Sequence, residues 1–287
     1  MFKTKNSAGM TLIELMLSLT LSFLIISSVL EIYLLAENTR HLQSNIITLQ
    51  ENAEIISLIL KNNIKASSWF GCAKLTDDFP FKNHLPFLLN QKNHIVPYQS
   101  DQVKAGSDAV QIWHSSIRSD VILKKMQGNS ALYISSGLRI VANDNLIISD
   151  CRTAEAFRVK EVIQMKDKVQ KIIPAKPLDK IYEKNSEINK LEMEAFFIGK
   201  TKRFNEKHNA IYAFYSKDMS GKKTEWIENV SQMKIFFSVL QHNRLVDYPI
   251  ASIKNADDIK GVSFDLDLIL RSKTELHKNW NIYVALS

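Results

Sequence analysis

One uninterrupted apolar segment near the N-terminus limits what this chain can fold into. Between Glu14 and Glu31 the sequence contains no charged residue, no glycine and no proline. With its apolar flanks, the segment exceeds the ~20 residues that a helix needs to cross the hydrocarbon core of a bilayer. A backbone in lipid must satisfy its own hydrogen bonds, so the segment is predicted to be helical. Lys3 and Lys5 precede it, which predicts a cytoplasmic N-terminus and export of the rest of the chain.

The residues before the apolar segment form a short, polar and basic leader, MFKTKNSAG, at positions 1–9. An ordinary secretory signal has its small-residue cleavage site after the apolar stretch, whereas here the small residue, Gly9, comes before it. Cleavage between Gly9 and Met10 would therefore leave the membrane helix, residues 10–35, on the mature protein. It would also remove two lysines and lower the formal charge from +7 to +5.

The residues around this site, GMTLIEL at positions 9–15, resemble the processing motif of type IV prepilins. The resemblance implies that a prepilin peptidase cuts after Gly9 and methylates the new N-terminus at Met10. It also implies that Glu14, the fifth residue of the mature chain, acts in fibre assembly. The sequence departs from the family at one position, because the first mature residue is usually phenylalanine.

Glu14 carries a free-energy cost that calls for a partner. A carboxylate inside a bilayer costs roughly 2.5–3.5 kcal/mol on insertion scales. Cleavage would create an ammonium at Met10, four residues away on the same helix. The resemblance implies a second arrangement, in which Glu14 neutralises the amine of a neighbouring subunit. The alternative is a glutamate solvated by lipid headgroups, which is what we expect for Glu31, about 25 Å further along the helix.

The helix is predicted to continue beyond the membrane as an amphipathic segment, residues 36–66. Apolar residues recur there at spacings of three and four. They are Leu42, Ile46, Leu49, Ala53, Ile56, Leu60 and Ile64. An isolated coiled coil is the alternative use of such a stripe. We expect it to pack on a sheet of the same chain instead.

Residues 67–287 are predicted to form a periplasmic, β-rich globular head. Short apolar alternations bounded by turn residues predict strands, and most connections are too short for helical crossovers. The predicted strands cover residues 109–114, 130–135, 138–141, 145–148, 157–163, 194–199, 210–215, 224–227, 233–240, 261–270 and 281–285. The expected fold class is therefore α+β, a long helix packed on an antiparallel sheet. Two irregular regions are expected: residues 74–108, and an exposed, charged excursion at residues 164–192.

The head contains several short motifs in a characteristic order. They are WFGCA at 69–73, SDAV at 107–110, DC at 150–151 followed by AFRV at 156–159, and DLILRS at 267–272. This order resembles the minor pilins of the PilW family. The resemblance implies a subunit of the inner membrane and then of the pilus tip, active in pilus assembly, cell adhesion and twitching motility. Implied partners are other minor pilins, the major pilin, the inner-membrane assembly platform and a tip adhesin.

The two cysteines, Cys72 and Cys151, belong on the periplasmic side under this topology, where disulfides persist. We therefore expect one disulfide that closes a loop of about 80 residues. Two buried free thiols are the alternative.

No enzyme motif is present, and we expect neither catalytic residues nor a cofactor. The sequence lacks the P-loop, GxSxG, HExxH and dinucleotide fingerprints, and its seven histidines show no repeated metal spacing. A metal site is therefore not expected. Asp265 and Asp267 alternate with apolar residues, which is typical of the exposed face of a strand.

Two other functions keep the same fold. A type II secretion pseudopilin of the J type would share the leader and the large β-rich head. A minor pilin that binds DNA in natural transformation would fit the basic pI of about 9.2. Acidic residues alternate with the lysines, however, so we do not expect nucleic-acid binding.

Overall fold

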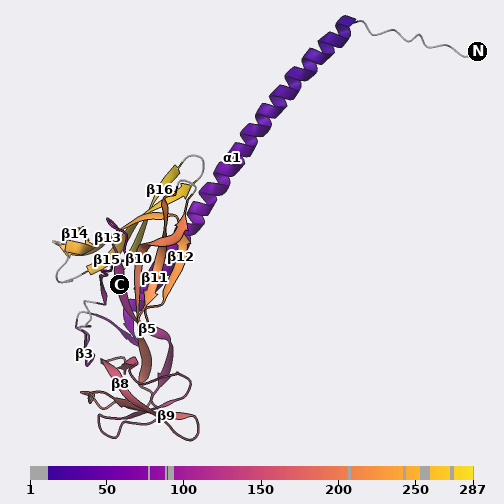
Figure 1. Ribbon diagram of the computed structural model, residues 1–287. Coiled ribbons are helices and arrows are strands. Elements are labelled where there is room, and N and C mark those ends of the chain that lie inside the picture. Colours follow the sequence, from indigo (N-terminus) through magenta and orange to yellow (C-terminus); the bar gives the residue numbers. More distant parts are fainter. Residues whose placement is uncertain are drawn as a thin grey trace, which may run out of the picture. The chain divides into compact units, whose positions relative to one another are not determined.

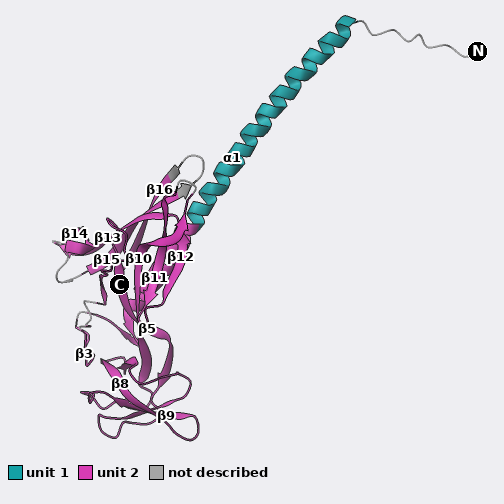
Figure 2. Ribbon diagram, viewed as in Figure 1, with its two compact units in different colours: residues 1–51 teal, residues 52–287 magenta. Residues whose placement is uncertain are grey.

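The computed structural model describes residues 12–286 except 77, 88, 90–93, 206–207, 242–243, 253–258 and 272–274. The chain divides into two compact units, residues 1–51 and residues 52–287 (Figure 2).

Helix α1 begins at Leu12 and ends at Ser67, a length of 56 residues (Figure 1). No glycine or proline interrupts it, so every carbonyl within it can accept a bond from the fourth following N–H group. In unit 1, the large apolar side chains from Leu12 to Leu35 are exposed. The long N-terminal helix predicted from the apolar segment is confirmed.

The last part of α1 lies in unit 2, and it buries one face. Ala53, Ile56, Leu60 and Ile64 have no exposed surface, and they follow the predicted spacing of three and four. Leu58 belongs to another face and is 62% exposed. The predicted stripe therefore packs into the core of unit 2 from Ala53 to Ile64, whereas Leu42, its first predicted member, is 49% exposed.

A four-stranded antiparallel sheet in unit 2 has the order β14-β13-β15-β16 (Figure 1). Its strands are β13 (Val230–Gln241), β14 (Arg244–Pro249), β15 (Ile259–Arg271) and β16 (Glu275–Ala285). In β15, Phe264, Leu266 and Leu268 are buried, Asp265 is exposed and Asp267 is half-buried. The predicted alternation of buried apolar and more exposed acidic side chains along this strand is confirmed.

The larger sheet of unit 2 has ten strands, with the order β12-β11-β10-β7-β8-β9-β6 and three further strands off that path. The strands of its path are β6 (Leu132–Ser135), β7 (Asn145–Ser149), β8 (Ala154–Gln164), β9 (Val169–Pro174), β10 (Glu187–Phe204), β11 (Ala210–Asp218) and β12 (Lys223–Glu228). Strand β5 (Val110–Val121) pairs with β10 and with β4 (Ile95–Pro97), and β3 (Phe81–Asn83) pairs with β8. The β3–β8 pair is parallel, and the other pairs described are antiparallel.

The predicted exposed excursion at residues 164–192 is wrong. Strand β9 lies inside it, paired with β8 on one side and β6 on the other, and β10 begins in it at Glu187. Leu178 and Tyr182 are buried in the core cluster around β6, β8 and β9. The inward face of β9 consists of Gln170, Ile172 and Pro174, so one of its three buried residues is polar and another is a proline, which is unfavourable inside a strand.

The strand predicted at 138–141 is also wrong, because this segment is a loop between β6 and β7. Leu138 and Ile140 are nevertheless buried, which explains why apolar residues alternate in this segment of the sequence. The buried side chain of Gln170 donates hydrogen bonds to the carbonyls of Ser135 and Leu138, both at 3.0 Å. A side chain thus supplies donors that a strand partner would otherwise supply.

Two short strands complete unit 2, β1 (Trp69–Phe70) and β2 (Ala73–Lys74), which form a hairpin directly after α1. The predicted α+β class is confirmed. A long apolar N-terminal helix packed on antiparallel sheets is a pilin-like architecture.

The buried face of α1 should contribute to the stability of unit 2. Leu60→Ala is expected to lower the free energy of unfolding by about 2–5 kcal/mol, because it leaves a cavity under a fully buried side chain. Leu58→Ala is the matched control on the same helix and should change that energy by about 0.5 kcal/mol or less. Urea denaturation of the detergent-solubilised chain, followed by near-UV circular dichroism, measures both. Equal effects would contradict the assignment of the buried face.

Candidate functional site

The exposed apolar part of α1 is the first candidate site. The described residues include one helix that is long and apolar enough to cross a membrane, and it is α1. Several hydroxyl side chains on this part donate to carbonyls of the preceding turn. Examples are Ser18 to Leu15 at 2.9 Å and Ser28 to Leu24 at 2.9 Å. These hydroxyls therefore need no water, which suits a helix surrounded by lipid or by other helices.

Glu14 lies in the first turn described for α1, and its side chain is exposed. A negative charge is favourable there, because the first turn of a helix carries a partial positive charge. The next acid along the helix, Glu31, is exposed as well, which makes it a natural comparison. Gly9 and Met10, the predicted cleavage and methylation positions, lie outside the described residues.

The disulfide between Cys72 and Cys151 is present, so the predicted pairing is confirmed. It joins the β1–β2 turn to the turn between β7 and β8, across a sequence separation of 79 residues. Gly71 has a φ of +65°, which a glycine adopts without strain, and its missing Cβ lets Asn189 approach closely. The bond therefore ties the segment that follows α1 to the large sheet.

Asp150 shapes the turn that contains Cys151. Its Oδ1 accepts hydrogen bonds from the N–H groups of Thr153, at 2.9 Å, and Arg152, at 3.2 Å. Its Oδ2 accepts a bond from Lys180 Nζ at 2.5 Å. Burial alone would raise the pKa of Asp150, but these donors favour the carboxylate and leave its pKa lowered. The turn that carries the disulfide is thus fixed by a charged network.

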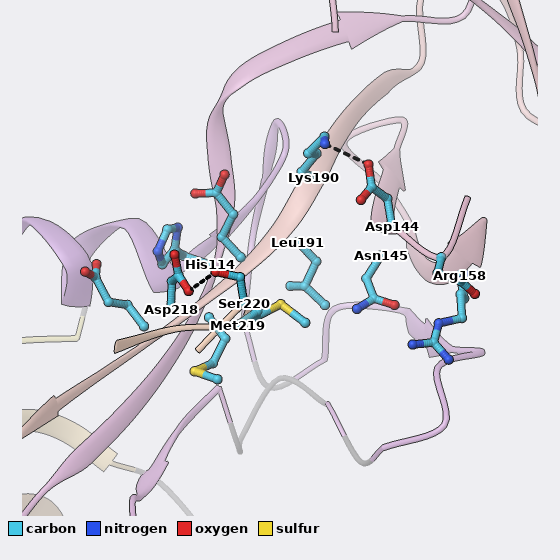
Figure 3. A pocket seen from close by; sticks show the side chains of 13 residues that line it. His114, Asp144, Asn145, Arg158, Lys190, Leu191, Asp218, Met219 and Ser220 are labelled. Carbon is cyan, nitrogen blue, oxygen red and sulfur yellow. Dashed lines mark hydrogen bonds and ion pairs between the residues drawn. The ribbon is translucent and has the colours of Figure 1, made fainter. Parts of the chain in front are cut away.

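The second candidate site is a pocket of about 660 Å³ on the large sheet (Figure 3). Its walls come from β5, β7, β8, β10 and the turn after β11, segments that are far apart in the sequence. Lys190 donates to Asp144 at 2.7 Å, and Ser220 donates to Asp218 at 2.6 Å; Figure 3 shows both bonds. The buried Oδ1 of Asn145 has no hydrogen-bond partner within the described chain.

This pocket lies at a gap in the pairing of β10. Along one edge, β5 pairs with β10 from Glu187 to Phe196. Along the other edge, β7 pairs with residues 187–190 and β11 pairs from residue 194 onwards. Residues 191–193 therefore have no partner strand on that edge within the described sheet. Such a backbone edge can pair with an extended segment of another chain.

The pocket carries side chains of both signs, which suits a polar protein surface better than an apolar ligand. Burial would raise the pKa of Asp218 slightly, but the Ser220 hydroxyl and the backbone N–H groups of the same turn outweigh it and lower that pKa. The Ser220 hydroxyl therefore donates a hydrogen bond within its own turn and stabilises that turn. No sequence motif marks this pocket, because its walls come from four strands and a turn that are far apart in the chain.

Comparison with known proteins identifies no relative of this chain. No family model matches it, and neither the curated proteins nor the solved structures contain a match.

The disulfide yields a stability prediction. Cys72→Ser with Cys151→Ser is expected to lower the free energy of unfolding by about 4 kcal/mol, because the bond restricts a long loop in the unfolded chain. Urea denaturation of the detergent-solubilised double variant and of the oxidised wild type measures the difference. Reduced wild type is the control and should match the double variant. A difference below about 1 kcal/mol would contradict a stabilising disulfide.

Proposed function

We propose that this protein is a minor pilin similar to the PilW family, which is held in the bacterial inner membrane before it enters a type IV pilus. Prepilin peptidase cleaves it after Gly9 and methylates Met10. The mature subunit then joins other minor pilins in the complex that starts the fibre and remains near its tip.

The proposal rests on one observation: along α1, the apolar side chains change from exposed in the first part to buried on one face in the last part. Large apolar side chains are exposed from Leu12 to Leu35, whereas one apolar face of the later part of α1, formed by Ala53, Ile56, Leu60 and Ile64, is buried in unit 2. The exposed part needs an apolar environment other than its own head, because its transfer to water is unfavourable. A bilayer supplies this environment before assembly, and neighbouring helices supply it in a fibre.

Glu14 gives the subunit a reason to leave the bilayer and enter the fibre. A carboxylate in lipid is costly, and the amine of a neighbouring subunit would offset that cost in the fibre. The charge pair forms only between subunits that are aligned in register. The same carboxylate therefore favours assembly and sets its geometry.

Glu14→Ala tests the assembly role. In cells that carry the pilus machinery, the variant is expected to insert normally, because removing a charge favours insertion. Its recovery in sheared fibres, and with partner pilins, should fall at least about tenfold, which corresponds to about 1.4 kcal/mol of lost pairing. Quantitative immunoblots of membranes and fibres measure both.

Glu31→Ala is the matched control, because Glu31 is also exposed on α1 and lies near the predicted far interface. Its incorporation should stay near the wild-type level. Unchanged recovery of the Glu14 variant, or equal losses for both variants, would contradict the proposal. The partners that co-purify with the wild type identify the machine: pilins of a pilus support it, and components of a secretion system would overturn it.

Processing gives a separate prediction. Mass spectrometry of the mature chain is expected to find an N-terminal peptide that begins at Met10 and carries one added methyl group. The reason is that the small residue of the leader precedes the apolar helix. An N-terminus beyond residue 30 would instead indicate an ordinary signal peptide and would remove the basis for membrane anchoring.

A further inference from the structure

We propose that His84, Glu155 and Asp179 form a site for a transition-metal dication, with zinc as the best fit. His84 follows β3, Glu155 lies in β8 and Asp179 lies in the loop between β9 and β10. One ligand atom of each residue lies within 4.8 Å of the other two. All three residues belong to unit 2, and the site is independent of the proposed role of α1.

The distances suit a small ion. The Nε2 atom of His84 is 2.8 Å from Oε2 of Glu155 and 3.9 Å from Oδ1 of Asp179. In a tetrahedral zinc site, bonds of about 2.0–2.1 Å place neighbouring ligand atoms about 3.3 Å apart. The two observed separations lie on either side of that value. Small side-chain rotations therefore suffice to bring all three atoms to one ion.

The charge balance favours a cation. Glu155 is 2% exposed, and the only basic side chain within 4 Å of its carboxylate among the described residues is the imidazole of His84. Asp179 adds a second carboxylate, whose nearest described cation, Lys82, is 4.0 Å away. The nearby ammonium of Lys180 already bonds to Asp150. A buried carboxylate without a full counter-charge is costly, and a dication would neutralise both acids together.

The backbone holds this ligand set in place. The N–H groups of Asp179 and Lys180 donate to the Glu155 carboxylate at 2.8 and 3.0 Å. The N–H of His84 donates to the carbonyl of Ala156 at 2.8 Å, which continues the parallel β3–β8 ladder. The backbone bonds of His84 and Asp179 leave the Nε2 and Oδ1 atoms of these two residues unused, whereas Oε2 of Glu155 accepts the Asp179 N–H and would bind an ion through its remaining lone pair. Bonds of this kind orient metal ligands in known sites.

A second, independent observation lies beside the cluster. The hydroxyl of Tyr182 is fully buried and has no hydrogen-bond partner in the described part of the chain. Tyr182 lies close enough to Glu155 for the two side chains to interact. A buried hydroxyl with unused hydrogen-bonding capacity thus stands near this carboxylate. It is suited to bond a water or carboxylate oxygen in the outer shell of an ion.

The ligand types select the metal class. Magnesium and calcium prefer oxygen-only sites, whereas an imidazole with two carboxylates suits zinc and related transition metals. The ion would link three segments that the chain otherwise joins by hydrogen bonds: the residue after β3, strand β8 and the loop after β9. We therefore expect it to stabilise this end of the head.

Metal titration of the full chain in detergent tests the site. Zinc chloride added to the metal-free protein is expected to raise the midpoint of thermal unfolding in a concentration-dependent way, and calorimetry should give one site per chain. Calcium and magnesium at the same concentrations should produce no shift. A wild type that does not respond to zinc, or that responds equally to calcium, would overturn the proposal.

Two variants locate the ion. Asp179→Asn removes a ligand from a side chain that is 55% exposed and keeps the backbone N–H that bonds Glu155, so the fold should survive. His84→Gln removes the nitrogen ligand. Each should weaken zinc affinity at least about tenfold. Retention of wild-type affinity by either variant would overturn the three-ligand site.

His277→Gln is the matched control. His277 Nδ1 lies 3.2 Å from Asp267 on the four-stranded sheet, and no third ligand accompanies this pair among the described residues. This variant should bind zinc as the wild type does. Loss of zinc binding in the control would place the ion elsewhere and contradict the proposal.

Discussion

Hydrogen bonding of the backbone in an apolar environment is the constraint on which the rest of this protein depends. In lipid, a helix satisfies each N–H and C=O group from within the segment. Helix α1 meets this requirement without interruption from Leu12 to Ser67, and its hydroxyl side chains bond to its own carbonyls. One continuous helix can therefore present an apolar surface in unit 1 and a buried apolar face in unit 2.

Strand β10 organises the larger sheet of unit 2. It has 18 residues and pairs with β5, β7 and β11, so segments from residue 110 to residue 218 meet on it. No single partner is as long as β10, and the second edge is shared between β7 and β11. The pocket of Figure 3 lies at the resulting gap. The unpaired stretch of β10 thus follows from a mismatch in strand lengths.

The end of the head around β8 and β9 is held by three kinds of cross-link. The disulfide anchors the turn before β8. The ion pair between Asp150 and Lys180 joins that turn to the loop after β9. The Glu155 carboxylate accepts hydrogen bonds from two backbone N–H groups of the same loop. Long loops without strand partners leave polar groups that must be satisfied by side chains. Glu155, the one charged residue that is buried among the described residues, lies here, and the proposed metal site includes it.

The sequence by itself determined the features that depend on local pattern. These are the long helix, its apolar stripe from Ala53 to Ile64, most strands of the head and the α+β class, because periodicity and composition need no knowledge of distant contacts. The cysteine pairing followed from the number of cysteines and the compartment. Only the tertiary structure decided that residues 164–192 are partly buried, that Gln170 replaces a strand partner, and that His84 meets Glu155 and Asp179. Those outcomes depend on which distant segments become neighbours. A polar residue can be buried because a remote partner satisfies its hydrogen bonds, and such a residue looks exposed in the sequence.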